Sequence, residues 1–357
     1  MKSNFDILGN HIRLIDTRNR ESITDRVLGI NIDKFFMPSV ANVIGTDLSK
    51  YKLITKGKFA CNPMHVGRDE RLPVALYDEE EPAIVSPAYF MFEVIDNSIL
   101  NEDYLMMWFR RPEFDRICWL HTDGSVRGGI TWDDICRLEL PIPPIEKQLE
   151  IVNSYKAITE RIVLKQKIND NLDDTAQTLY QKYFESNSDK SSWKQGTVGD
   201  VLQLQRGHDL PRTEMTGGKY PVAGSTGTIG YHDEFTAEAP VIVMGRSGNI
   251  GNPRLYLCNC WTHNTSLYVK QIYEAEPLWV FYLLKNLNYD GFVGGSAVPT
   301  LNRNDVHAYG IAIPPLELQK SFSQKVMSLI YCKEENLSEI EKLQELQKII
   351  LTTMSSR

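Results

Sequence analysis

Two thiols and an imidazole that could bind a metal ion lie close together in the sequence, at Cys258, Cys260 and His263. Such groups are typical of zinc sites, which normally take four ligands. No fourth ligand stands at a recognisable spacing, so the metal site is a secondary interpretation. The six cysteines are scattered along 357 residues, which is more typical of reduced thiols in a cytoplasmic protein.

A glycine-rich stretch, Gly245–Gly251, is the second group with possible chemistry. Its backbone N–H groups could face a phosphate, but it has neither the glycine spacing of a dinucleotide-binding loop nor the lysine of a P-loop. The sequence therefore favours a turn-rich loop, which could also contact a DNA backbone, over a nucleotide site.

The sequence also lacks the patterns expected of a catalyst acting on DNA. Asn62-Pro63-Met64-His65 has neither the second proline nor the aromatic residue with which DNA methyltransferases position a flipped base. The seven histidines form no triad signature with serine or cysteine, and no acidic cluster suggests a nuclease. These patterns predict a noncatalytic protein.

The elements that must position these residues are organised as a repeat. Leu140–Gln148 reads LPIPPIEKQ, its counterpart Ile311–Gln319 reads IAIPPLELQ, and a long helical segment follows each copy. A repeat with so long a period predicts a duplicated domain rather than a solenoid. The same offset places Gly124-Ser125 on Gly295-Ser296, Ile130 on Leu301, and Asp134-Ile135 on Asp305-Val306.

Each repeat is predicted to contain a globule and a helix. Short apolar stretches alternate with turns in both globules, and an apolar helix precedes each signature, at Tyr104–Phe109 and at Leu278–Leu284. A chain of 357 residues is long enough for two such cores. The predicted fold class is α+β, with a globule at 1–144, a helix at 145–190, a second globule at 191–315 and a second helix at 316–357.

Both helical segments carry an apolar stripe of residues three and four apart. Lys165 and Asn169 interrupt the first stripe, and Asn336 and Gln347 interrupt the second. Helices this long favour pairing with each other, so we expect an antiparallel coiled coil in which two copies of one unit are related by a pseudo-two-fold axis. The alternative is that each helix packs on its own globule. The predicted seam of the second helix comprises Ile340, Leu343, Leu346 and Ile350.

The net charge is −7 and no segment is basic, which argues against nonspecific binding to nucleic acid. This balance permits specific binding by a few cations gathered on one face, or phosphate contacts supplied by a partner. No apolar run is long enough to span a membrane, and the N-terminal residues lack the apolar core of a secretion signal. These features predict a cytoplasmic protein.

The two signatures and the helices that follow them resemble specificity subunits of type I restriction-modification systems. The resemblance covers nearly the whole chain and includes Ile44–Lys52, Tyr104–Phe114, Gly245–Gly248 and Gly295–Asn302. It implies two target-recognition domains, each reading one half of a bipartite, asymmetric DNA site, and paired helices that act as spacer and docking surface. The implied partners are double-stranded DNA, two methyltransferase subunits that modify adenine at N6, and two restriction subunits. S-adenosylmethionine, ATP and Mg²⁺ are implied for those partners and not for this chain.

The resemblance supplies no base-contacting residues, because members of this family share little in their recognition loops. We therefore choose candidates by chemistry: arginine binds guanine bidentately, asparagine binds adenine, and serine or histidine binds base edges or phosphates. The alternative for each is a solvated loop residue or a structural hydrogen bond. The candidates are Asn62, His65, Arg68 and Arg127 in the first domain, and Arg206, His208, Arg246, Ser247, His263, Asn264 and Arg303 in the second.

A DNA-recognition subunit is the favoured hypothesis, mostly because of the resemblance, and two other functions stay open. An enzyme that uses Cys258, Cys260 and His263, or the Gly245–Gly251 loop, would bind zinc or a nucleotide. A coiled-coil assembly protein would have globules with no preference among DNA sequences.

Overall fold

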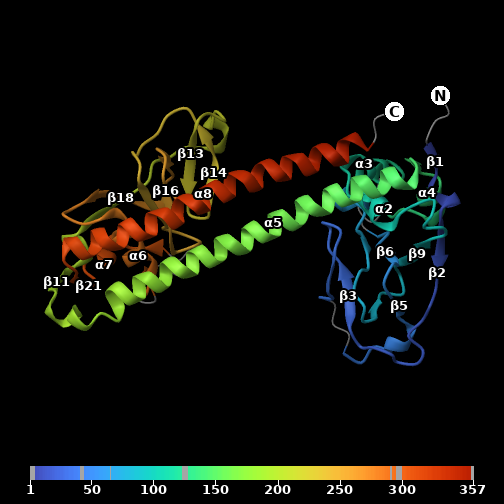
Figure 1. Cartoon of the computed structure of the whole chain (residues 1–357), viewed down its shortest axis with the longest axis horizontal. Helices are drawn as coiled ribbons and strands as arrows, with labels where there is room; N and C mark the ends of the chain where they lie inside the picture. Colours follow the sequence, from blue (N-terminus) through green and yellow to red (C-terminus); the bar gives the residue numbers. More distant parts are fainter. Residues whose placement is uncertain are drawn as a thin grey trace. The chain divides into compact units, whose positions relative to one another are not determined.

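The computed structural model describes residues 5–40, 44–64, 66–122, 128–289, 292–294 and 300–354. The chain divides into two compact units: one comprises Met1–Leu164 and Glu339–Arg357, and the other comprises Lys165–Ser338. Each unit contains one globule and part of both long helices (Figure 1). Among the described residues, no helix combines the length and apolar character that crossing a lipid bilayer requires.

The globule of the first unit is built on two small sheets. One is antiparallel, with the order β2 (Ile12–Ile15), β9 (Phe90–Val94), β6 (Phe59–Cys61) and β7 (Val74–Leu76). The other has the order β4 (Phe36–Pro38), β3 (Val27–Ile30), β8 (Ala83–Val85) and β5 (Lys52–Ile54), and its β3 and β8 are parallel. Strand β1 (Phe5–Ile7) pairs with β10 (Glu139–Pro141), which joins the two ends of the globule.

Short helices complete this globule and carry much of its core. They are α1 (Val66–Asp69), α2 (Glu102–Phe109), α3 (Pro112–Leu120) and α4 (Trp132–Cys136), with 3-10 turns η1 (Leu8–Asn10) and η2 (Leu48–Lys50). The Asn101 side chain caps α2 by accepting a hydrogen bond from the Tyr104 N–H. Every residue of Tyr104–Phe109 is buried, and the Phe59 and Phe92 rings beneath them stack at 5.0 Å. The predicted apolar helix is therefore a core helix.

The globule of the second unit repeats this arrangement. Its antiparallel sheet has the order β12 (Leu202–Arg206), β18 (Ser266–Ile272), β15 (Val241–Gly245) and β16 (Gly251–Tyr256). Its second sheet has the order β14 (Gly227–His232), β13 (Tyr220–Gly224) and β17 (Trp261–Thr262), and β13 and β17 are parallel. Strand β11 (Lys194–Thr197) pairs with β21 (Gly310–Ile313), as β1 pairs with β10.

Two of the short helices of the second unit also correspond to helices of the first. Helix α6 (Pro277–Asn286) takes the place of α2, and α7 (Arg303–His307) takes the place of α4. The described elements also differ: β5 adds a fourth strand to the second sheet of the first globule, and helices α1 and α3 have no counterpart in the second globule. The unit also contains η4 (Ser188–Ser192), η5 (Val198–Asp200), η6 (Arg212–Glu214), β19 (Val293–Gly294) and β20 (Thr300–Leu301).

A buried glutamine connects each globule to the long helix that follows it. Gln148 in α5 (Ile145–Tyr180) donates to the carbonyls of Ile99 and Pro143, both at 2.8 Å, and accepts a hydrogen bond from the Asn101 N–H. Gln319 in α8 (Leu316–Thr353) donates to the Pro314 carbonyl and accepts from the Glu276 N–H. The two side chains are 0% and 1% exposed. The repeated signature is therefore a junction in which the glutamine satisfies backbone groups of both elements.

The two long helices run antiparallel within each unit. In the first unit the Arg161 guanidinium pairs with Glu339, and the Gln347 amide donates to the Thr159 hydroxyl at 2.7 Å. In the second unit α5 continues as a π-helical turn (Gln181–Glu185), and its Tyr180 and Phe184 rings lie against Phe322 of α8. The predicted fold class, an α+β protein of two similar globules with antiparallel paired helices, is confirmed.

Three of the four polar residues that interrupt the apolar stripes meet each other in the second unit. The Asn336 amide donates to Asn169 Oδ1 at 2.9 Å, and the Lys165 ammonium donates to Asn336 Oδ1 at 2.8 Å. Both asparagines are buried. A buried polar pair of this kind favours one register of a helix pair at some cost in stability.

One residue predicted at the helix-pairing seam, Leu346, is exposed instead. Ile340 is 6% exposed, whereas Leu346 is 44% exposed. The contact of Gln347 with Thr159 places Gln347 on the paired face, and Leu346 is turned away by one residue, or about 100°. The apolar pattern of the sequence predicted Leu346 at the seam instead of its polar neighbour Gln347.

Replacing Gln148 with leucine should destabilise the first unit. The change leaves the Asn101 N–H and the two carbonyls without their partner in a buried place, and each such group costs about 1–3 kcal/mol. We expect the free energy of unfolding, measured by denaturant titration, to fall by about 3 kcal/mol. The neighbouring Lys147→Ala, on an exposed side chain paired with Glu150, is the matched control and should change it little. Equal effects of the two variants would contradict the junction role.

The second unit should lose stability on mild acidification. His307 Nε2 accepts a hydrogen bond from the Leu204 N–H at 2.8 Å, so the ring there is neutral, and burial, together with the nearby Arg303, lowers the pKa of His307. The unfolded chain takes up this proton near pH 6.5, whereas the folded chain takes it up at a lower pH. This contribution is complete above pH 6.5 and is lost as the pH falls through the folded pKa.

The measurement is the melting temperature between pH 7.5 and 5.5. His307→Gln supplies an acceptor that does not titrate, and should flatten the dependence. An unchanged slope in this variant would assign the pH dependence to other groups.

Candidate functional site

Most candidates of the second globule lie on loops around one end of its sheets. The connection from β15 to β16, Arg246–Ile250, forms a tight hairpin. A Cβ on Gly245 would lie 1.6 Å from the Asn249 carbonyl oxygen, so this position requires glycine, and the φ of +79° at Gly248 favours glycine there. The hairpin presents Arg246 and Ser247, both half-buried.

A second loop packs directly against this hairpin. It joins β17 to β18 and contains His263 and Asn264. The Arg246 N–H donates to the Thr265 carbonyl at 3.0 Å, and the His263 N–H donates to the Ala223 carbonyl at 2.9 Å. His263 Nδ1 lies 2.9 Å from the Thr265 hydroxyl, which orients its ring.

The segment that leaves β12 forms a third part of the same surface. The His208 N–H donates to the Thr262 carbonyl at 2.7 Å, and its backbone bridges to His263. Arg206 donates to the Asn264 carbonyl, and the Asn264 amide donates to Asp209. The polar groups of Arg206 and Asn264 are thus partly engaged within the loops, although the Arg206 side chain is half exposed.

The fourth part is the segment around β20. The Leu301 N–H donates to the Arg246 carbonyl at 2.8 Å, and Thr300 bridges to Ser247. Arg303, exposed at the start of α7, follows two residues later. All seven candidates of the second globule therefore lie on four segments that backbone hydrogen bonds join. Among the described residues, neither Arg246 nor Arg303 has a carboxylate within ion-pairing distance.

The first globule has a matching loop pair. The connection from β6 to β7, which carries Asn62 and Arg68, takes the place of the β15–β16 hairpin. The Ile130 N–H donates to the Pro63 carbonyl at 3.2 Å, as the Leu301 N–H donates to the Arg246 carbonyl. The predicted alignment of Ile130 with Leu301 thus marks the same backbone contact. The candidates His65 and Arg127 lie outside the described residues.

The two described candidates of the first globule make local contacts. Asn62 Oδ1 accepts a hydrogen bond from the Met64 N–H at 3.1 Å, which closes a turn. Arg68 forms a two-pronged ion pair with Asp69 at 2.6 and 2.8 Å, which raises the pKa of Arg68. Asn62 therefore shapes the connection, whereas the Arg68 side chain is 56% exposed and able to exchange Asp69 for another anion.

Sequence reasoning missed Arg71, which lies in the same connection as Arg68. Arg71 is half exposed and pairs with Asp33 at 3.0 Å. Placing β6 and β7 on β15 and β16 in the structure identifies the connection that carries it. The sequence offset does not, because it aligns only the later part of the two globules: Ile130 matches Leu301 at that offset, whereas Pro63 and Arg246 do not.

The alternative chemistries have little geometric support. The Cys260 thiol is buried, and burial raises its pKa to about 12, which favours the protonated form over a metal-binding thiolate. No three His, Cys, Asp or Glu side chains group as metal ligands within the described ranges. The glycine loop opens strand β16, whereas a phosphate-binding glycine loop opens a helix whose N-terminal N–H groups face the anion.

Comparison with known proteins agrees with the resemblance seen in the sequence. Residues 190–349 match the sequence model of the type I restriction modification DNA specificity domain. A putative type I restriction enzyme MjaX specificity subunit of Methanocaldococcus jannaschii is 21% identical, over 98% of this chain and 88% of that protein.

Two solved structures are similar in fold. The type I restriction-modification S subunit from M. genitalium has a TM-score of 0.63 at 16% identity and covers 100% of this chain and 97% of that one. A chain from work on complex assembly and conformational transition of the type I system has a TM-score of 0.51 at 16% identity, over 98% and 96% of the two chains. The chain is thus similar to the specificity subunits of type I restriction-modification systems, and its residues 190–349 match their DNA specificity domain.

Proposed function

We propose that this chain is the noncatalytic DNA-recognition subunit of a type I restriction-modification complex in the cytoplasm. The observation that carries the proposal is the gathering of Arg206, His208, Arg246, Ser247, His263, Asn264 and Arg303 on four joined segments of the second globule. Arginine, asparagine, histidine and serine are the side chains that read base edges and hold phosphates. Polar side chains that are exposed or half-buried, on loops joined by backbone hydrogen bonds, suit DNA reading better than catalysis.

The charge of the chain limits how it binds DNA. With a net charge of −7, the chain as a whole repels a polyanion, so nonspecific attraction contributes little. Binding then depends on the few cations of the loop segments and on phosphate contacts supplied by partner subunits. This favours recognition of particular sequences within an assembled complex over tight binding by the isolated chain.

The duplicated globule supports a site in two parts. Both globules contain the same sheet order, yet the β6–β7 connection, Asn62–Pro73, is longer than the β15–β16 connection, Arg246–Ile250. Loops that differ in length and composition present different donors. The two half-sites of the proposed DNA target therefore differ, which makes the site asymmetric.

The chemistry is proposed to reside in partner chains. We assign adenine N6 methylation to two methyltransferase subunits and ATP-driven cleavage to two restriction subunits, which dock on this chain. S-adenosylmethionine, ATP and Mg²⁺ belong to those partners. The support is the similarity to specificity subunits and the weak geometry of the metal and glycine-loop alternatives.

The first test is a map of N6-methyladenine across the host genome with and without the gene. Deletion should abolish methylation at one split, asymmetric motif while every other methylated motif persists. A complementing plasmid restores the motif if the effect belongs to this gene. An unchanged map, in a host that expresses the partner subunits, would contradict the proposed function.

Substitution of Arg246 should affect one half-site only. A bidentate arginine contributes about 1–3 kcal/mol of discrimination at a guanine, so Arg246→Ala should weaken binding to the matching half-site roughly 10- to 100-fold. Arg246→Lys keeps the positive charge but lacks the guanidinium group that donates two parallel hydrogen bonds, so it should lose the same preference. The readout is binding of the assembled complex to duplexes that each vary one base pair.

Arg212→Ala is the matched control, because it removes the same charge from an exposed turn, η6, outside the four segments. A uniform loss of affinity for every duplex in Arg246→Ala, with full recovery in Arg246→Lys, would instead make Arg246 a phosphate contact.

A further inference from the structure

The turn between β3 and β4 in the first globule contains a buried lysine. The Lys34 N–H donates to the Asn31 carbonyl, the Asp33 N–H donates to Asn31 Oδ1 at 2.9 Å, and Lys34 has a φ of +68°. This left-handed conformation is unfavourable for a side chain of this type. The turn directs the Lys34 side chain inward, where it is 4% exposed.

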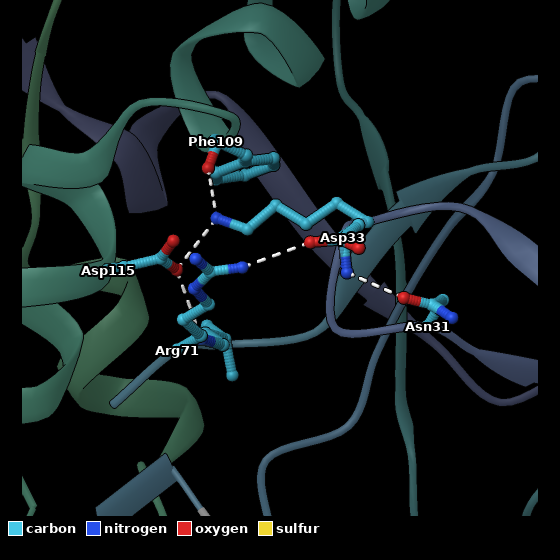
Figure 2. Close-up of polar contacts among 7 residues, drawn as sticks. Asn31, Asp33, Arg71, Phe109 and Asp115 are labelled. Atoms are coloured by element: carbon cyan, nitrogen blue, oxygen red, sulfur yellow. Dashed lines mark hydrogen bonds and ion pairs between the residues drawn. The ribbon is translucent and has the colours of Figure 1, made fainter. Parts of the chain in front are cut away.

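The Lys34 ammonium joins the turn to two helices. It donates to the Phe109 carbonyl at the end of α2 and to Asp115 Oδ1 in α3 at 2.7 Å, and it lies 4.8 Å from the centre of the Phe114 ring. Burial lowers the pKa of Lys34, and the adjacent Asp115 carboxylate opposes that change. Figure 2 labels Phe109 and Asp115, the two residues that accept these hydrogen bonds.

The same turn and the same carboxylate hold the end of the β6–β7 connection. Asp115 Oδ1 also accepts a hydrogen bond from the Leu72 N–H at 3.1 Å, and Arg71 pairs with Asp33 at 3.0 Å (Figure 2). The connection that carries Asn62 and Arg68 therefore ends in a network centred on Asp33, Lys34 and Asp115.

The second globule makes the corresponding contact with different residues. Ser225 lies in the turn from β13 to β14, which takes the place of the β3–β4 turn. Asn249, in the hairpin that carries Arg246, donates from its amide to the Ser225 carbonyl at 3.2 Å, and its Oδ1 accepts from Asn252. In both globules, then, a turn of the second sheet forms polar contacts with a connection of the antiparallel sheet. The turns are β3–β4 and β13–β14, and the connections are β6–β7 and β15–β16.

These contacts are poorly explained as sources of stability. Asp33 and Arg71 are more than half exposed, and ion pairs of that kind contribute little. A buried pair such as Lys34 with Asp115 is often replaced by apolar residues without loss of stability. These contacts instead determine where the β6–β7 and β15–β16 connections lie relative to the second sheet of their own globule.

We propose that Asp33, Lys34 and Asp115 in the first globule, and Asn249 with its Ser225 contact in the second, are positioning residues that set the specificity of the two half-sites. The proposal rests on the proposed DNA-reading function. Each half of the DNA target is read by a loop whose shape a neighbouring turn determines. Lys34 and Asp115 are too buried to contact DNA, so their effect on sequence preference is transmitted through the connection that ends at Leu72.

The test uses the full chain assembled with its methyltransferase subunits, and measures methylation of duplexes in which either half-site is varied. Lys34→Met with Asp115→Asn removes the ion pair without leaving a buried charge, and the new amide still accepts from the Leu72 N–H. We expect the preference at one half-site to fall by about tenfold or more while the other half-site is read as before. Asn249→Ala should lower the sequence preference at the other half-site.

The pair Asp33 and Arg71 lies at the surface, so substitutions there should leave folding intact, and exchanging the two residues tests whether their contact can be restored. Asp33→Ala and Arg71→Ala should each relax the same half-site as the Lys34 variant. The exchanged pair, Asp33→Arg with Arg71→Asp, should restore the preference if the contact acts by positioning. Failure of the exchange would mean that Arg71 itself reads DNA and would overturn its assignment as a positioning partner.

The outcomes distinguish a failure of this positioning proposal from a failure of the proposed DNA-recognition function. A wild-type complex without sequence preference would contradict the proposed function. If the wild type reads its target and all these variants keep the same preference in both halves, positioning by the turns is wrong. A lowered melting temperature with uniformly reduced methylation of every duplex would show a purely structural role and would also overturn it.

Discussion

The buried glutamine at the start of each long helix is the contact on which the two-part architecture depends. A globule that passes directly into a helix leaves backbone groups of both elements in a place that water does not reach, and such groups must find partners. Gln148 and Gln319 supply a donor and an acceptor at once, to the Pro143 or Pro314 carbonyl and to the N-terminus of α2 or α6. The side chain thereby fixes the direction in which the helix leaves its globule. Between the second proline and the glutamine the copies share an exposed glutamate, Glu146 or Glu317, and differ at the positions on either side of it.

The signature was visible in the sequence because this constraint acts on neighbouring residues. The repeated Pro-Pro-x-Glu-x-Gln pattern, the apolar core helices and the interrupted helical stripes all reflect contacts close in sequence or periodic along a helix, and each led to a correct element. Periodicity identified Lys165, Asn169 and Asn336 as interruptions. It did not show that they bond to one another, because nothing in a single stripe specifies which turn of the partner helix faces it.

Features that depend on distant residues were not predictable. The loops of the second globule contain glycines and a dense set of polar residues, so choosing candidates by residue type identified residues that the fold brings together. In the first globule the matching connection differs in length, and the correspondence of Pro63 with Arg246 emerges only from the shared sheet order and the shared hydrogen bond. Arg71 was missed for this reason. Its contact with Asp33 joins parts of the chain whose proximity no local pattern records.

The two globules share a frame and differ in the means by which loops are held on it. Backbone hydrogen bonds recur at equivalent places, from Ile130 to Pro63 and from Leu301 to Arg246, and backbone bonds do not depend on side-chain identity. The contacts between turn and loop use side chains instead, a charged network in the first globule and an asparagine in the second. Changes of sequence in the loops therefore leave the frame intact while they alter what the loops present. The frame and the positions of the loops can therefore vary independently in sequence, because backbone atoms make the contacts that fix one and side-chain atoms make the contacts that fix the other.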